Sequence, residues 1–264
     1  MKLSINHYIC SEEIAFSDFI QIVSDAGIPS IGVTCSAIEE MGIDNLKSCI
    51  SDYGLSVSSL NSAGYFTHSS KRPNRYTDQE LIEFSAMLNA DILCVITGGL
   101  NLQTQSLSET HECVSKKIGE LADNAERYGV TVGLEPINPK DIFSKGCINT
   151  ISHALEIIRP YKNAKLILDF YHSWWDKGLL DIINDNAQHI GLIQICNIGL
   201  DKNKNLERRT IKDGIIDFQN FIPEILTSNY NQKIELEIFC EHLKTKNTKE
   251  VINEFSLYMK NFLI

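Results

Sequence analysis

The segment AKLILDFYHSWWD, residues 164–176, changes within a few positions from an apolar strand pattern to a cluster of polar and aromatic groups. Residues 166–168 form the unbroken apolar run that is typical of a parallel strand with both faces covered. Asp169 ends this run, and His172 follows three residues later. A carboxylate at the end of a buried strand must be solvated, paired or metal-bound. The segment therefore predicts a functional site at one end of a parallel sheet, with loop capping by Asp169 as the structural alternative.

The composition limits the classes of protein to which the chain can belong. Its 264 residues, of which 43% are hydrophobic, can bury one large α/β core or two smaller ones. The net charge of −10 opposes binding to nucleic acid. No signal-peptide pattern or apolar run of membrane-spanning length occurs, so we expect no membrane contact and a cytoplasmic location. The eight cysteines lack C-x-x-C spacing, which favours reduced thiols in the core.

One unit, an apolar strand followed by a polar loop and an amphipathic helix, repeats along the chain. The predicted strands are residues 3–6, 28–33, 55–60, 91–96, 130–135, 164–169, 190–196 and 233–239. The predicted helices are residues 13–26, 36–41, 44–53, 78–89, 108–128, 150–160, 179–186, 217–228 and 250–262, and residues 61–74 read as a long polar loop. Eight units of about 33 residues predict a single-domain (β/α)8 TIM barrel over residues 1–264.

Polar side chains end the last four predicted strands. They are Glu135, Asp169, Gln194 and, on the last strand, Glu235 and Glu237. Carboxylates that meet at one barrel mouth either share protons or neutralise a cation. Oxygen ligands favour Mg²⁺ or Mn²⁺, whereas zinc prefers more nitrogen. Glu235 and Glu237 point to the same face, and Glu237 lies nearer the mouth, so we assign Glu237 to the site and Glu235 to the interior.

Seven segments in order resemble the motifs of the sugar phosphate isomerase/epimerase family, the xylose isomerase-like TIM barrels. They are VITGG, GLEPINP, the Asn149–Leu155 run, LDFYHSWWD, LIQICN, ERRTIKDGIID and IELEIF. The resemblance implies one divalent metal ion, Mg²⁺ or Mn²⁺ first and Zn²⁺ or Co²⁺ as alternatives. Its ligands would be Glu135, Asp169, Gln194 and Glu237. Gln194 departs from the pattern, because most relatives have a histidine there.

The same resemblance implies residues that contact the substrate. His172 and Arg208 match positions that hold substrate oxygens, although Arg208 lies in a charged segment whose ordinary interpretation is a solvated surface. In the expected mechanism, Trp174 or its neighbour Trp175 covers the apolar face of a sugar. Asn138 and Asn197 stand where relatives often have His and Asp, in loops that line the family's pocket.

The predicted reaction is isomerisation or epimerisation of a small sugar, keto-sugar or keto-acid. The metal would chelate the carbonyl and a neighbouring hydroxyl group and stabilise an enediolate. Glu135 and Glu237 are the predicted catalytic residues, one removing a proton and the other returning one.

Three alternatives stay open at the sequence level. A lyase or dehydratase that acts on an inosose or dehydroshikimate type of substrate would use the same frame. An apurinic-site endonuclease would need more histidines and a basic groove, which Gln194 and the net charge oppose. A non-catalytic sugar-binding barrel would not need the two glutamates. Barrels of this kind are frequently dimers, and Tyr65 and Phe66 offer aromatic side chains for a homodimer interface.

Overall fold

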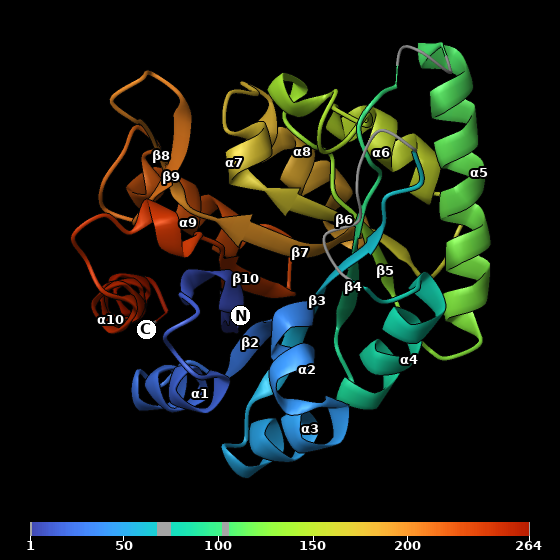
Figure 1. Ribbon diagram of the computed structural model, residues 1–264. Coiled ribbons are helices and arrows are strands. Elements are labelled where there is room, and N and C mark those ends of the chain that lie inside the picture. The colour runs from blue at the N-terminus through green and yellow to red at the C-terminus, as the bar shows by residue number, and fades with distance from the viewer. Residues whose placement is uncertain (1, 68–74, 102–105, 264) are drawn as a thin grey trace.

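Eight parallel strands close into a barrel in the computed structural model of the chain, which describes residues 2–67, 75–101 and 106–263 (Figure 1). The strands neighbour one another in the order β1, β10, β7, β6, β5, β4, β3, β2. Their bounds are Leu3–Asn6 (β1), Ser30–Thr34 (β2), Ser56–Gly64 (β3), Ile92–Ile96 (β4), Val132–Leu134 (β5), Ala164–Asp169 (β6), Ile190–Ile195 (β7) and Lys233–Leu236 (β10). The predicted TIM barrel is confirmed.

Helices connect the strands and surround the barrel (Figure 1). They are Phe16–Asp25 (α1), Cys35–Met41 (α2), Ile43–Asp52 (α3), Asp78–Leu88 (α4), Leu107–Glu126 (α5), Ile151–Ile158 (α6), Phe170–Ser173 (α7), Leu179–Asn186 (α8), Phe218–Thr227 (α9) and Thr248–Lys260 (α10). Capping boxes begin α4, α5 and α10, and these reciprocal hydrogen bonds satisfy the first backbone N–H groups of a helix. Among the described helices, none combines the length and the apolar character that a bilayer crossing requires.

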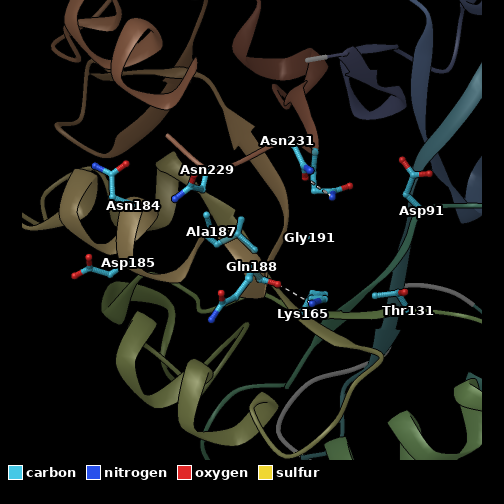
Figure 2. A pocket seen from close by; sticks show the side chains of 12 residues that line it. Asp91, Thr131, Lys165, Asn184, Asp185, Ala187, Gln188, Gly191, Asn229 and Asn231 are labelled. Atoms are coloured by element: carbon cyan, nitrogen blue, oxygen red, sulfur yellow. Dashed lines mark hydrogen bonds between the residues drawn. The ribbon is translucent and has the colours of Figure 1, made fainter. Parts of the chain in front are cut away.

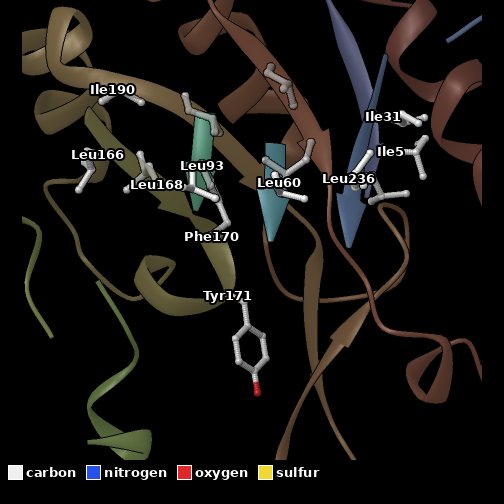
Figure 3. Packing of buried hydrophobic residues seen from close by; sticks show 14 of the residues in the cluster. Ile5, Ile31, Leu60, Leu93, Leu166, Leu168, Phe170, Tyr171, Ile190 and Leu236 are labelled. Atoms are coloured by element: carbon white, nitrogen blue, oxygen red, sulfur yellow. The ribbon is translucent and has the colours of Figure 1, made fainter. Parts of the chain in front are cut away.

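Alternation along each strand separates an apolar outer face from the barrel interior. Outward side chains such as Ile5, Leu93 and Leu236 pack in the main hydrophobic cluster (Figure 3). One part of the interior holds a second apolar cluster of Ile92, Cys94, Ile96, Ile137, Ile167 and Leu192. The rest of the interior is polar, and the candidate site lies at the carboxyl ends of the strands.

Three features differ from the predicted elements. β3 continues to Gly64, through the first residues of the predicted 61–74 loop, because Ala63 and Gly64 pair with β4 and are buried. Residues 68–74 of that predicted loop lie outside the described residues. A short antiparallel hairpin, Asn197–Leu200 (β8) and Leu206–Arg209 (β9), follows β7 and was not predicted. β5 and β10 end earlier than predicted, so Glu135 and Glu237 begin the loops that follow these strands.

Candidate active site

Three buried carboxylates lie at the carboxyl end of the barrel. Asp169 is the last residue of β6, and Glu135 and Glu237 are the first residues after β5 and β10. Only 1 to 5% of each residue is exposed. Strand register explains how Asp169 and Glu237 come to lie at the same end. Asp169, Gln194 and Glu235 are paired across β6, β7 and β10, so they lie at one level of the barrel. Glu237 lies two residues beyond Glu235, on the same face and nearer the mouth.

Arg208 links two of these carboxylates. Its Nη1 and Nη2 donate to the two oxygens of Asp169 at 3.2 and 2.5 Å, and Nη2 lies 3.5 Å from Oε2 of Glu237. The guanidinium also lies over the rings of Tyr171 and Phe239, at 4.4 and 5.1 Å from their centroids. With 1% of the residue exposed, Arg208 belongs to the site and not to a solvated loop. The β8–β9 hairpin brings it there.

His172 presents a hydrogen-bond donor to the same carboxylates. Its Nδ1 accepts the backbone N–H of Asn138 at 3.0 Å, so the proton of the neutral ring is on Nε2. Nε2 lies 3.4 Å from Oε1 of Glu135 and 3.7 Å from Oδ2 of Asp169. Burial and the charge of Lys145 hold the pKa of His172 well below its ordinary value, which keeps the ring neutral. His172 is therefore a donor rather than a metal ligand in this arrangement.

The glutamates are costly to keep charged in this environment. Burial raises the pKa of Glu135 to about 7, and the nearby Lys145 ammonium opposes part of that effect. Burial also raises the pKa of Glu237 well above its ordinary value, although Arg208 opposes it. Each carboxylate gains from a cation, since a positive charge at close range stabilises the ionised form.

The oxygen atoms of the site are of the kind that a hard divalent cation takes as ligands. Glu135 and Asp169 place carboxylate oxygen atoms within 4.8 Å of each other, and His172 completes the group as the neighbouring hydrogen-bond donor. Oε1 of Gln194 and Oε2 of Glu237 are buried and, among the described residues, make no hydrogen bond, although Nη2 of Arg208 lies 3.5 Å from Oε2 of Glu237. Buried oxygen atoms with free lone pairs are the ligands that such a cation takes. Of the predicted ligands, Glu135 and Asp169 lie in one group with His172, whereas Glu237 lies outside that group and is linked to Asp169 through Arg208. Binding of one ion by all four predicted residues stays a prediction.

Two predicted substrate contacts have a local role in this structure. Oδ1 of Asn138 accepts the backbone N–H of Lys140 and caps a short helical turn. Trp174 is half-buried against the main hydrophobic cluster, and its Nε1 has no described hydrogen-bond partner. Contact of either residue with a substrate stays a prediction.

Lys145 lies near the site, and the sequence analysis did not identify it. Its Nζ lies 5.9 Å from the centroid of the Phe239 ring, the ring that Arg208 also contacts. Backbone bonds fix its loop, since Lys145 N donates to Asp141 O at 2.9 Å and Gly146 bridges Gly98. The segment 139–146 shows no periodic pattern, so nothing in the sequence marks Lys145 as inward-facing.

A separate hollow lies at the opposite end of the barrel. It has a volume of about 500 Å³, and Asp91, Thr131, Lys165, Gln188 and Asn231 are among its lining residues (Figure 2). Lys165 is near the start of β6, whereas Asp169 ends that strand, so the hollow is separate from the carboxylates. TIM-barrel chemistry is found at the carboxyl ends of the strands. The candidate active site is therefore the group of carboxylates at the carboxyl ends of the strands, and this hollow is not part of it.

Comparisons with known proteins agree with this architecture. Residues 20–260 match a family model described as xylose isomerase-like TIM barrel. No curated protein sequence matches the chain.

Three solved structures show the same fold at low identity. A Sinorhizobium meliloti 1021 protein is 24% identical, with a TM-score of 0.85 over 98% of this chain and 97% of that one. The E. coli 3-keto-D-glucoside 4-epimerase YcjR is 20% identical, with a TM-score of 0.76 over 99% of both chains. The zinc-bound IolI protein is 17% identical, with a TM-score of 0.75 over 100% of both.

Proposed function

The chain belongs to the xylose isomerase-like TIM barrel family, and we propose that it is an isomerase or epimerase of a small sugar or related hydroxy-carbonyl compound, dependent on Mg²⁺ or Mn²⁺. The observation that carries the proposal is the pair of buried glutamates. Glu135 and Glu237 follow β5 and β10, with Asp169 and Gln194 on the two strands between them. Solved sugar epimerases of the same fold support the reaction class.

The two glutamates suit proton transfer at a carbon beside a carbonyl group. A general base works best when its pKa lies near the pH at which the enzyme operates. Without a cation, burial raises the pKa of Glu135 to about 7 and also raises the pKa of Glu237. A bound cation would lower both pKa values, so each group could be ionised and act as a base near neutral pH. One carboxylate removes the proton, and the other returns a proton to the opposite face or to the neighbouring carbon. The first outcome is epimerisation and the second is isomerisation.

The neighbouring side chains orient the reacting groups. Nε2–H of His172 points at the carboxylate side of the mouth and is the donor for a substrate oxygen. Arg208 holds Asp169 through two hydrogen bonds and donates to the backbone O of Glu237 at 3.2 Å. It therefore fixes the position of one proposed acid–base residue. Trp174 would cover the apolar face of the sugar.

Glu135, Asp169, Gln194 and Glu237 would hold the divalent cation. When bound, that cation supplies Lewis acidity, which polarises a carbonyl group and makes the neighbouring C–H more acidic. The oxygen-only donor set is the reason to expect Mg²⁺ or Mn²⁺ before zinc.

Hydrogen exchange in D₂O tests the proposal directly. We expect the Mn²⁺-loaded protein to incorporate solvent deuterium into at least one member of a panel of C3 to C6 ketoses and keto-acids, followed by NMR. Glu135→Gln and Glu237→Gln should each slow turnover about 10²- to 10⁴-fold with the metal still bound, because each removes one proton-transferring group.

A glutamate outside the site provides the control. Glu241 is exposed and lies four residues after Glu237, so Glu241→Gln should keep the wild-type rate. Full activity in either site variant would refute the two-base scheme. Release of water with formation of a conjugated double bond would instead identify a dehydratase in the same frame.

A further inference from the structure

Glu235 is a fully buried carboxylate that the proposed reaction does not use. It has 0% exposure and lies one level below Glu237 in the barrel interior. No described lysine, arginine or histidine lies within ion-pair distance of it. Its oxygens instead accept hydrogen bonds from Ser58 Oγ at 2.5 Å, Asn6 Nδ2 at 2.8 Å, Gln194 Nε2 at 3.0 Å, Ser59 Oγ at 3.0 Å and Ser4 Oγ at 3.4 Å.

The barrel is built to accommodate this cluster. A shift in the pairing of β2 with β3 lets both Ser58 and Ser59 reach Glu235. Gly32 on β2 leaves room for the group, because a Cβ atom there would lie 2.6 Å from Oε2 of Glu235 and 2.7 Å from Nδ2 of Asn6. An unpaired buried charge is costly, and these donors provide the compensation that a cation would otherwise supply.

The cluster fixes the orientation of the Gln194 side chain. A carboxylate oxygen without a proton can only accept, so the amide nitrogen of Gln194 must face Glu235. The other end of the amide is therefore turned away from Glu235. That atom, Oε1, is buried and makes no hydrogen bond to the described residues. Gln194 pairs in register with Asp169 on its other side.

We propose that Glu235 is a positioning residue that holds the Gln194 amide with its oxygen towards the Asp169 and Glu237 carboxylates. Gln194 then offers the cation an oxygen and never an NH₂ group. The part of this inference that concerns the cation rests on the proposed function, whereas the amide orientation does not. An amide at position 235 could donate or accept, so Glu235→Gln would allow the Gln194 amide to turn over.

Mn²⁺ titration monitored by electron paramagnetic resonance tests the effect on the cation. Glu235→Gln should weaken Mn²⁺ binding about 10- to 100-fold, as loss of a ligand-orienting partner typically does. In a Gln194→Ala background the same change should alter affinity by less than about twofold, because no amide is left to orient. An equal effect in both backgrounds would mean a general structural role and would overturn the proposal.

Ser58→Ala is the matched control. It removes a donor to Oε2 of Glu235 but leaves the bond from Gln194 to Oε1 intact. Its Mn²⁺ affinity should stay within about twofold of wild type even where the variant is less stable. A weakening as large as that of Glu235→Gln would count against the specific link between Glu235 and Gln194.

A measurement without metal decides the orientation itself. In ¹⁵N-glutamine-labelled wild-type protein, the side-chain NH₂ signal that disappears in Gln194→Ala should exchange slowly with solvent. In Glu235→Gln, or in Glu235→Asp if the first variant does not fold, this protection should be lost. Rapid exchange already in the wild type would overturn the inference. If the wild type binds no Mn²⁺ but shows the protected signal, the proposed function fails and the positioning role of Glu235 stands.

Discussion

At the scale of single residues, Arg208 determines the charge balance of the mouth when no metal is bound. Among the residues that the structure describes, it is the charged side chain that forms ion pairs with Asp169 and Glu237. In Arg208→Gln, two buried carboxylates lose that contact, and removing one partner of a buried ion pair typically costs about 3–5 kcal/mol. We expect a loss of this order in the free energy of unfolding, measured in urea with a chelator present.

Mn²⁺ should restore part of that loss, because a bound cation would replace the missing positive charge near Asp169. Arg159→Gln is the control, since Arg159 is exposed and its described side-chain contact is one hydrogen bond, to Asn186. Its stability should change by about 1 kcal/mol or less, with or without metal. An Arg208→Gln protein as stable as the wild type in chelator would contradict this account of the charge balance.

At the scale of elements, the β8–β9 hairpin positions Arg208, and Asn197 fixes the hairpin. Nδ2 of Asn197 donates to the backbone O of Ile211 and Ile216, and Oδ1 accepts the N–H of Ile198 and Ile216. Both polar atoms of the Asn197 side chain are therefore engaged by the backbone of β8 and of the loop after β9, and a contact of this residue with a substrate stays a prediction.

Gly214 makes this arrangement possible. A Cβ atom there would lie 2.2 Å from Oδ1 of Asn197. Gly214→Ala should therefore lower the free energy of unfolding by about 1–3 kcal/mol, as overpacking does. Hydrogen exchange in residues 197–209 should become faster, as measured by mass spectrometry. Gly178→Ala is the control, because the added Cβ would meet Asp176 at an ordinary 3.4 Å. Equal exchange in the two variants would disprove the role of Gly214.

The elements also show what the sequence can predict. Strand and helix periodicity gives the barrel, and the shared carboxyl ends of parallel strands bring Glu135, Asp169 and Glu237 together. The hairpin was missed because its two strands have only four residues each and three of the four residues of β9 are charged. The inward position of Lys145 was missed because tertiary contacts of a non-periodic loop create it. The link between Glu235 and Gln194 requires the register of β7 and β10, which no local pattern specifies.

At the scale of the whole molecule, the stability of the barrel depends on pH through His7, which is buried after β1. Its Nδ1 lies 2.7 Å from Oγ1 of Thr34, and its ring packs against Phe16 and Phe19 at centroid distances of 4.9 and 5.1 Å. Burial lowers the pKa of His7 from 6.5 to about 4. Between these values the unfolded chain binds a proton that the folded protein resists.

Folding stability due to neutral His7 is therefore fully present above about pH 6.5 and is lost as the pH falls towards 4, by up to about 3 kcal/mol. His7→Gln keeps a polar group for Thr34 but removes the titration. The difference in unfolding free energy between wild type and His7→Gln should accordingly shrink, or reverse in sign, between about pH 7.5 and about pH 4.5. The titration of carboxylates contributes equally to both proteins, so it cancels in this difference.

His189→Gln is the control, at a half-exposed histidine near the start of β7, and it should show a smaller change. A difference for His7→Gln that is constant with pH would show that His7 is not the group responsible.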